Sequence, residues 1–173
     1  DGSQVVPPHD KGIIDKVAGV KPEDIKFTPD ENLIEIIGEK VDKAFVDAAV
    51  ANGSSDATGR DDFKIVYTPI HGTSFKAMIP ALKEAGFKNV ITVPEQMIPS
   101  GDFPTVKSPN PENPEALSMA MDLAYKTGAD MVVGTDPDAD RIGIAVRNLK
   151  GELQLLNGNE TNTVLIAYLL ERW

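Results

Sequence analysis

Cysteine is absent from this chain of 173 residues, which excludes disulfide bonds, zinc–thiolate sites and cysteine nucleophiles. Histidine occurs only at positions 9 and 71, which argues against a metal site built from several imidazoles. Basic residues are scarce: 17 Lys and Arg stand against 27 Asp and Glu, and the net charge of −10 argues against a nucleic-acid or anionic-membrane surface. No apolar run approaches 18 residues, so no membrane-spanning helix is predicted.

The composition is otherwise that of a soluble globular protein, with 41% hydrophobic and 25% charged residues. A domain of about 150 residues buries roughly 70% of its unfolded surface, so its core needs no cross-links. The chain starts at Asp1 rather than Met, its first ten residues lack the features of a signal peptide, and residues 160–173 form a helical pattern with apolar residues that need a surface to cover. We expect an excised piece of a larger protein; the alternative is a processed chain whose last helix packs on its own body.

Hydrophobic periodicity predicts helices at 10–18 and 33–51, then a polar loop, and from residue 63 onward an alternation of strands and helices. Strand–helix–strand units imply parallel pairing through right-handed crossovers. The link between the last two predicted strands has only about five residues, so that pair must be antiparallel. The predicted fold class is α/β: three α/β/α layers around a four-stranded mixed sheet, with strands at 63–68, 89–94, 129–136 and 141–148, helices at 74–86 and 114–128, and a long irregular loop at 94–113.

Three alternating carboxylates follow the third predicted strand, at Asp136, Asp138 and Asp140, and Arg141 comes directly after them. The carboxyl end of a strand is the usual ligand edge of α/β sheets. Carboxylates this close together repel one another, and oxygen ligands without sulfur or imidazole favour Mg²⁺, Mn²⁺ or Ca²⁺. An EF-hand is excluded because its glycine and glutamate positions hold Arg141 and Arg147. The remaining alternative is an acidic hairpin that stays hydrated.

Other polar residues near this edge are weaker candidates. His71 follows the first predicted strand and could line the site, although a turn histidine bonded to backbone is the preferred interpretation. Lys107 in the long loop could face a phosphate, but a solvated side chain is preferred. Ser74 is interpreted as a helix cap, and His9 and Ser108 are given no role.

The segments GTDPDADRIGIAV, YTPIHGTSFKAMIPALKEAGF and GDFPTVKSPNPENPEAL resemble the second domain of the α-D-phosphohexomutase family, the phosphoglucomutases and phosphomannomutases. DGSQVVPPHDKGIIDKV resembles the end of the family's first domain, and LLNGNETNTVLIAYLLERW resembles the start of its third. The resemblance therefore implies three parts: residues 1–60 from the preceding domain, a metal-loop α/β domain at 61–150, and the start of the following domain at 151–173.

The resemblance also implies a mechanism. A phosphoserine of the first domain exchanges its phosphoryl group with a sugar phosphate through a bisphosphate intermediate, in a cytoplasmic enzyme. Mg²⁺ is held by Asp136, Asp138, Asp140 and an oxygen of the phosphoserine, and Arg141 steadies the phosphoryl group as a catalytic residue. The partners are then a glucose or mannose phosphate and the other domains, with no nucleic acid and no membrane.

Two features depart from the family pattern. The loop reads DPDADR where many relatives have DGDGDR, which leaves a phosphopentomutase-type substrate open. The family's Thr-Ala-Ser-His-Asn-Pro serine loop has no counterpart here, so the chain alone is expected to be inactive. The alternative functions are a non-catalytic module that binds a metal or a sugar phosphate, and a Mg²⁺-dependent phosphatase with an aspartate nucleophile.

Overall fold

The computed structural model describes residues 3–53 and 56–172 of the chain, which divides into two units after Ile37. The first unit contains helix α1 (His9–Ala18) and two short 3₁₀ helices, Pro22–Asp24 and Glu31–Leu33. Asp10 stands in the first turn of α1, and Lys16 stands in its last turn. These charges match the helix dipole, but no described residue of this unit is buried, so α1 has no core of its own.

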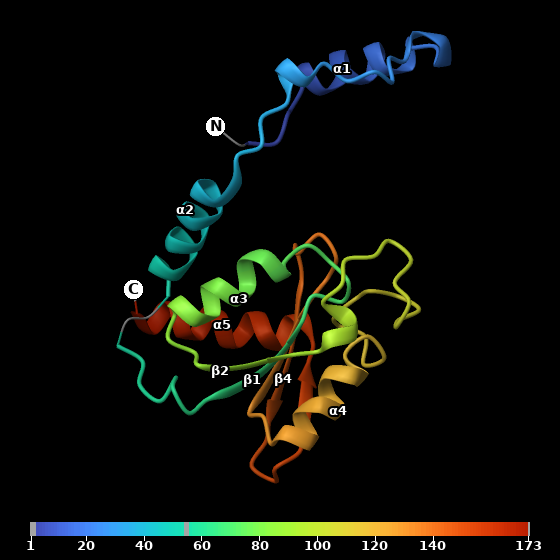
Figure 1. The fold of residues 1–173 in the computed structure, drawn as a ribbon. Coiled ribbons are helices and arrows are strands. Elements are labelled where there is room, and N and C mark those ends of the chain that lie inside the picture. Colours follow the sequence, from blue (N-terminus) through green and yellow to red (C-terminus); the bar gives the residue numbers. More distant parts are fainter. Residues whose placement is uncertain (1–2, 54–55, 173) are drawn as a thin grey trace. The chain divides into compact units, whose positions relative to one another are not determined.

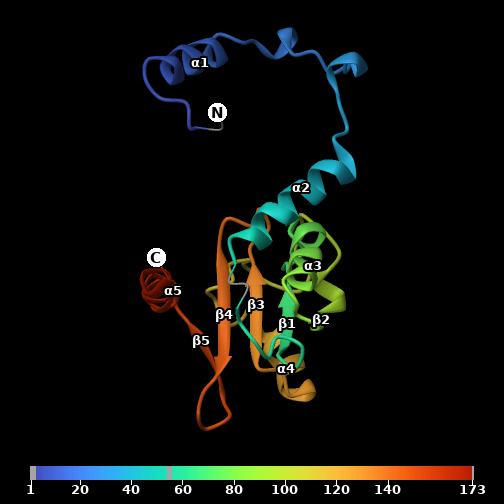
Figure 2. The ribbon, with the colours of Figure 1, turned by 90° about the vertical axis from the view of Figure 1, so that its left-hand side faces the viewer.

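The second unit is an α/β domain built on one sheet (Figure 1). Its helices are α2 (Gly38–Ala51), α3 (Phe75–Glu84), α4 (Ser118–Thr127) and α5 (Gly158–Arg172), with a 3₁₀ turn at Pro94–Gln96. Its strands are β1 (Lys64–Thr68), β2 (Asn89–Thr92), β3 (Met131–Thr135), β4 (Ile142–Arg147) and β5 (Leu153–Leu156). Figure 2 shows the strand order β2-β1-β3-β4-β5 across the sheet. No helix of residues 3–53 and 56–172 is both long enough and apolar enough to cross a membrane.

Strand direction decides which loops become neighbours. β1 pairs in parallel with β2 and β3, whereas β4 runs antiparallel to β3, and β5 runs antiparallel to β4. Thr68, the last residue of β1, lies beside Gly134 near the end of β3. The turn after β1 and the loop after β3 therefore leave the sheet side by side, at the same edge.

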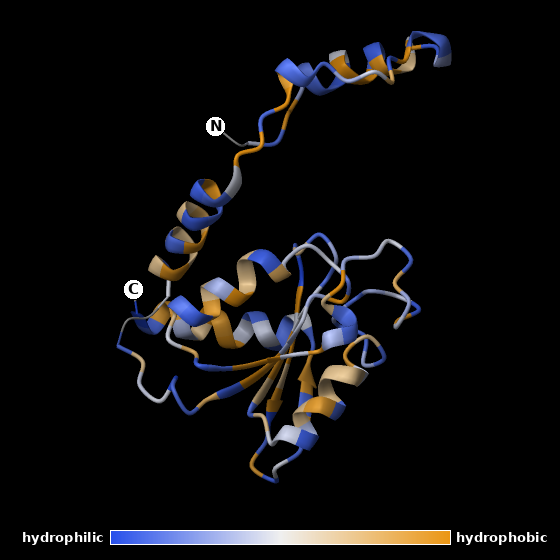
Figure 3. Cartoon of the chain, in the orientation of Figure 1, coloured by the Kyte–Doolittle hydropathy of each residue, from blue (hydrophilic) through white to orange (hydrophobic). Residues whose placement is uncertain are grey.

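The core lies on both faces of the sheet, because alternate strand residues point to opposite sides. On one face, Ala120 and Ala124 of α4 lie in the same buried cluster as Val66 and Val132. On the other face, side chains of α3 pack against Tyr67 and its neighbours. Figure 1 shows α3 and α4 on opposite sides of the sheet, and Figure 3 shows that the strands between them are largely hydrophobic. This confirms the three predicted layers.

The predicted sheet of four strands is wrong by one strand, since β5 adds a fifth beside β4. β5 has only four residues, and its segment was interpreted as the start of another domain. Its Leu153 is nonetheless buried and joins the cluster beneath α4. The domain boundaries at residues 60 and 150 stay predictions.

Two helix starts also differ from expectation. The helix predicted over 33–51 begins only at Gly38, whose φ of +56° is incompatible with a continuous right-handed helix. The helix predicted from Pro114 begins at Ser118, after a series of turns. Its end is as predicted: Gly128 adopts a left-handed conformation with φ +66° and caps the helix.

Candidate metal centre

The three aspartates lie in the six-residue loop 136–141 that joins β3 to β4, which we call the aspartate loop. Thr135 and Ile142 face each other at its base in the antiparallel register. Within the loop, the amide of Ala139 donates to the carbonyl of Asp136 at 3.1 Å, so the chain reverses in a tight turn. Ala139 has a φ of +63°, a left-handed conformation that favours glycine.

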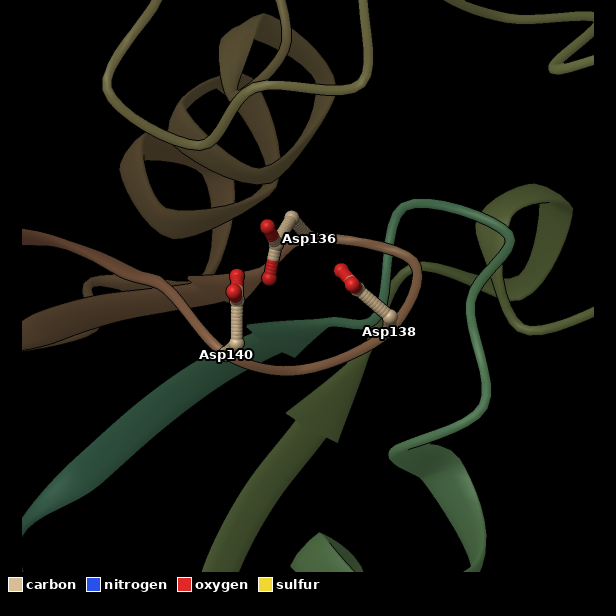
Figure 4. A group of neighbouring side chains, drawn as sticks. All are labelled: Asp136, Asp138 and Asp140. Carbon is tan, nitrogen blue, oxygen red and sulfur yellow. The ribbon is translucent and has the colours of Figure 1, made fainter. Parts of the chain in front are cut away.

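The turn brings the three carboxylates together. One oxygen from each of Asp136, Asp138 and Asp140 lies within 4.8 Å of the others. Figure 4 shows the three side chains directed toward one another across the inside of the loop. Asp136 is fully buried, whereas Asp138 and Asp140 are exposed. The sequence prediction of a carboxylate cluster at this edge is thus matched by the placement of the side chains.

Arg141 closes the loop onto Asp136. Its backbone amide donates to Oδ1 of Asp136 at 2.9 Å, and its Nε donates to Oδ2 at 2.8 Å. Nε also lies 3.5 Å from Oδ1 of Asp140. Among residues 3–53 and 56–172, no protein partner is found for the terminal amino groups of Arg141, which remain available to an anion.

The two flanking acids respond to this arrangement in opposite directions. Burial raises the pKa of Asp136, but the hydrogen bonds from the amide and guanidinium of Arg141 outweigh it, and the pKa of this carboxyl falls below its ordinary value. The hydrogen bond shared with Asp136 and the negative charges of Asp138 and Asp136 raise the pKa of Asp140. One arginine therefore compensates the buried charge and leaves the exposed carboxylates in mutual repulsion.

The donor set fits a hard divalent cation. An octahedral Mg²⁺ holds oxygen atoms at about 2.1 Å, so oxygens on opposite sides of it are about 4.2 Å apart. Neighbouring oxygens of the octahedron are only about 3.0 Å apart, and at most one pair among three ligands can be opposite, so a cluster within 4.8 Å has to contract around the ion. The exposed Asp138 and Asp140 have room to move inward. Both oxygens of Asp136 already accept a bond from Arg141, and each retains a second lone pair for a cation. Three protein oxygens leave about three positions for other ligands.

The remaining predicted residues lie outside this cluster. His71 is buried in a turn, where Nδ1 bonds to the carbonyl of Ile98 and Nε2 bonds to Oγ1 of Thr105, both at 2.9 Å. It therefore anchors the long loop instead of facing the aspartates. Lys107 is exposed and lies 3.8 Å from Glu115. These placements agree with the structural interpretations preferred for both residues.

Ser74 occupies the N-cap position of α3, as the sequence predicted, but it does not cap the helix through its side chain. Its hydroxyl is instead bonded to the hydroxyls of Tyr67 and Thr135, at 2.6 Å each. Sequence reasoning also missed Gly72 and Thr73, which contact the aspartate loop at Pro137. The only sequence signal for these contacts was that both segments follow parallel strands.

The fold and the site define a class: an α/β domain with three clustered carboxylates, which could hold a divalent cation, in the loop that follows β3. A family model described as phosphoglucomutase/phosphomannomutase, alpha/beta/alpha domain II, matches residues 43–151. The chain belongs to this family, which confirms the family and the second-domain assignment predicted from the sequence.

Individual relatives agree with this assignment. The chain is 33% identical over 175 residues to a "probable phosphomannomutase" of Haemophilus influenzae, covering 99% of this chain and 35% of the relative. It is 38% identical over 113 residues to a phosphoglucomutase of Staphylococcus aureus, covering 65% of this chain and 20% of the relative. The chain thus spans about a third or less of the length of these relatives.

A solved structure shares the fold. The phosphoglucomutase/phosphomannomutase family protein of Burkholderia thailandensis superposes with a TM-score of 0.62 over 76% of this chain and 26% of that protein. At 20% sequence identity, this likeness bears on the architecture alone.

Proposed function

We propose that this chain is the metal-binding central domain of a phosphohexomutase, which interconverts the 1-phosphate and 6-phosphate of glucose or mannose. The observation that carries the proposal is the convergence of Asp136, Asp138 and Asp140 at the carboxyl end of β3, in a chain of the phosphoglucomutase/phosphomannomutase family. The proposed cation is Mg²⁺, because carboxylate oxygens suit hard divalent cations and Mg²⁺ is the one commonly held by a few carboxylates together with substrate phosphates. When bound, it neutralises negative charge on a phosphoryl group in transfer.

The residues of the aspartate loop have different roles in this proposal. Asp136 is buried and fixed by two hydrogen bonds, so it sets the position of the site. Asp138 and Asp140 are exposed and adjust around the ion. Arg141 holds Asp136 through Nε and presents its terminal amino groups to a phosphoryl oxygen, since a guanidinium can bind two anions on different edges.

Space for a phosphoryl group lies beside the loop. A cavity of about 230 Å³ is lined by Arg141, by Thr161 and Asn162 of α5, and also by the carboxylates of Glu112 and Asp140 and by Ile142 and Gly158. The arginine and the hydroxyl and amide groups of this wall can donate hydrogen bonds to phosphate oxygens.

The whole reaction requires other domains. In this proposal, the phosphoserine and the loops that select the sugar lie in parts of the enzyme outside this chain, which covers 35% of the Haemophilus influenzae relative. The proposal keeps residues 1–60 and 151–173 as the flanking ends of those neighbouring domains, and a cytoplasmic location for the enzyme. Because the phosphoserine supplies one ligand, we expect this chain alone to bind Mg²⁺ weakly and to interconvert no sugar phosphates.

The test is a titration of the chain with Mn²⁺, followed by electron paramagnetic resonance, with Mg²⁺ as competitor. Asp138→Asn keeps the shape of the side chain and removes one ligand charge. Changes in outer-shell residues already cost about 10- to 100-fold in affinity, so this change should cost at least about tenfold. Asp122→Asn, on the exposed surface of α4, is the matched control and should bind as the wild type does. Unchanged affinity in Asp138→Asn would refute the site, and sub-micromolar Mg²⁺ binding would refute the sharing of ligands between domains.

A coupled mutase assay tests the wider proposal. The 173-residue chain should show no turnover with Mg²⁺ and a sugar bisphosphate, whereas the full-length enzyme should be active. Asp138→Ala in the full-length enzyme should reduce turnover severely and leave folding intact, because it removes repulsion within the loop. Turnover by the short chain alone would contradict the fragment assignment.

A further inference from the structure

The turn after β1, residues 69–74, is hydrogen-bonded to the aspartate loop at the residue that follows Asp136. The backbone amide of Thr73 donates to the carbonyl of Pro137 at 2.9 Å, and its hydroxyl donates to the same oxygen at 3.0 Å. Proline has no amide hydrogen, so this carbonyl is the only backbone polar group by which Pro137 can be held. One threonine therefore supplies two hydrogen bonds to the residue that follows Asp136.

The same turn holds the residue that precedes Asp136. Ser74 Oγ lies 2.6 Å from Oγ1 of Thr135 and 2.6 Å from the hydroxyl of Tyr67. The hydroxyls of Tyr67 and Thr135 are 3.4 Å apart, which closes a triangle of three hydroxyl groups. Thr135 is buried and belongs to β3, so the triangle joins the start of α3 to the strand that leads into the site.

Between these two attachments the backbones touch. A Cβ atom placed on Gly72 would lie 2.4 Å from Cα of Pro137, closer than real contacts allow. The contact requires glycine, and it leaves the aspartate loop no space to move toward the turn. Asp136 is thus fixed from both sides by residues that do not touch its carboxylate.

We propose that Thr73 and Ser74 are positioning residues for the metal site, which hold Asp136 where the three carboxylates can converge. The inference rests on the proposed function, because it assumes that the aspartates bind a cation. The physical reason is the charge of the cluster: Asp138 and Asp140 are exposed and lie close to Asp136, so like-charge repulsion favours an open loop. Backbone restraints act against that repulsion, in addition to the bonds from Arg141. Thr73 and Ser74 restrain the loop through Pro137 and Thr135.

The variant Thr73→Val keeps the amide bond to Pro137 and removes the hydroxyl bond. A net hydrogen bond changes an equilibrium by roughly threefold to tenfold, so Mn²⁺ affinity should fall by about that factor. Thr73→Ser restores a hydroxyl and should restore affinity. Thr127→Val is the matched control, because the Thr127 hydroxyl donates to the Leu123 carbonyl within α4, remote from the loop.

A readout without metal accompanies the titration. In the metal-free chain, amide hydrogen exchange at Ala139 and Arg141, whose amides donate to Asp136, should quicken in Thr73→Val and remain unchanged in Thr127→Val. Ser74→Ala should lower Mn²⁺ affinity in the same direction, and it provides a second test if Thr73→Val does not fold.

The outcomes separate the two proposals. If Asp136→Asn abolishes Mn²⁺ binding while Thr73→Val and Ser74→Ala bind as the wild type does, the positioning role is refuted and the metal site stands. If Thr73→Val and Thr127→Val weaken binding equally, the effect of Thr73 is general destabilisation and the inference is wrong. If Asp136→Asn binds Mn²⁺ normally, the proposed function fails, and the inference fails with it.

Discussion

Replacing Gly72 with alanine adds one methyl group at the point where the turn after β1 meets the aspartate loop. The new Cβ would lie 2.4 Å from Cα of Pro137, 2.7 Å from its carbonyl oxygen and 2.8 Å from the carbonyl oxygen of Pro69. All three are backbone atoms, so no side-chain rotation relieves the overlap. An ordinary contact begins near 3.4 Å, so Pro137 has to move by about 1 Å.

Overpacking of a well-packed site costs typically 1–3 kcal/mol, and backbone overlap places Gly72→Ala at the upper end, about 3 kcal/mol. For a protein of this size that corresponds to a fall in Tm of roughly 6–12 °C. Urea denaturation measures the change in the free energy of unfolding. Gly101→Ala is the control, since nothing lies within 4 Å of its Cβ position, and it should remain near the wild type. A cost below about 0.5 kcal/mol for Gly72→Ala would refute the close contact.

Three further predictions follow from single residues. Ala139→Gly should raise the free energy of unfolding by about 0.5 kcal/mol, because relief of the left-handed conformation outweighs the added freedom of the unfolded chain; urea denaturation showing a loss would contradict it. Burial raises the pKa of Tyr67 more than its bonds to Ser74 and Thr135 lower it, so absorbance at alkaline pH should show a late tyrosine ionisation that is absent in Tyr67→Phe. The stability that this neutral phenol contributes is complete below pH about 10 and is lost as the pH rises toward its higher native pKa; an alkaline titration that is the same in the wild type and Tyr67→Phe apart from its amplitude would refute this. Since the carbonyl of Ile98 can only accept, His71 must carry its proton on Nδ1, and ¹⁵N spectra showing an Nε2-protonated neutral ring would contradict the hydrogen-bond assignment.

Much of the sheet follows from local sequence pattern. β1, β3 and β4 are short apolar segments bounded by turns, and the six-residue loop between β3 and β4 is too short for a crossover, so their antiparallel pairing was predictable. The aspartate cluster was predictable for the same reason: alternation of Asp136, Asp138 and Asp140 in so short a loop leaves few ways to keep the side chains apart.

The features that escaped prediction depend on contacts between distant segments. Ser74 has the sequence position of a cap, but its hydroxyl is bonded to Tyr67 and to Thr135, which lies 61 residues away in the sequence. In the sequence, Gly72 cannot be distinguished from an ordinary turn glycine. Its requirement for glycine comes from the backbone of Pro137, which lies against it in the fold. β5 has only four residues, too few for a periodic hydrophobic signal in the sequence. It forms a strand by pairing antiparallel with the edge of β4. Local pattern determines the elements, whereas the partners of turn residues are determined only by the assembled sheet.

The most direct measurement of the central claim is an NMR titration of the chain with Mn²⁺, in which the paramagnetic ion broadens amide signals within its immediate surroundings. We predict that broadening begins at residues 136–141, extends to Gly72 and Thr73, and is reversed by excess Mg²⁺. Broadening centred elsewhere, or at the exposed acids of the surface with no preference for the aspartate loop, would contradict the assignment of Asp136, Asp138 and Asp140 as a divalent-cation site.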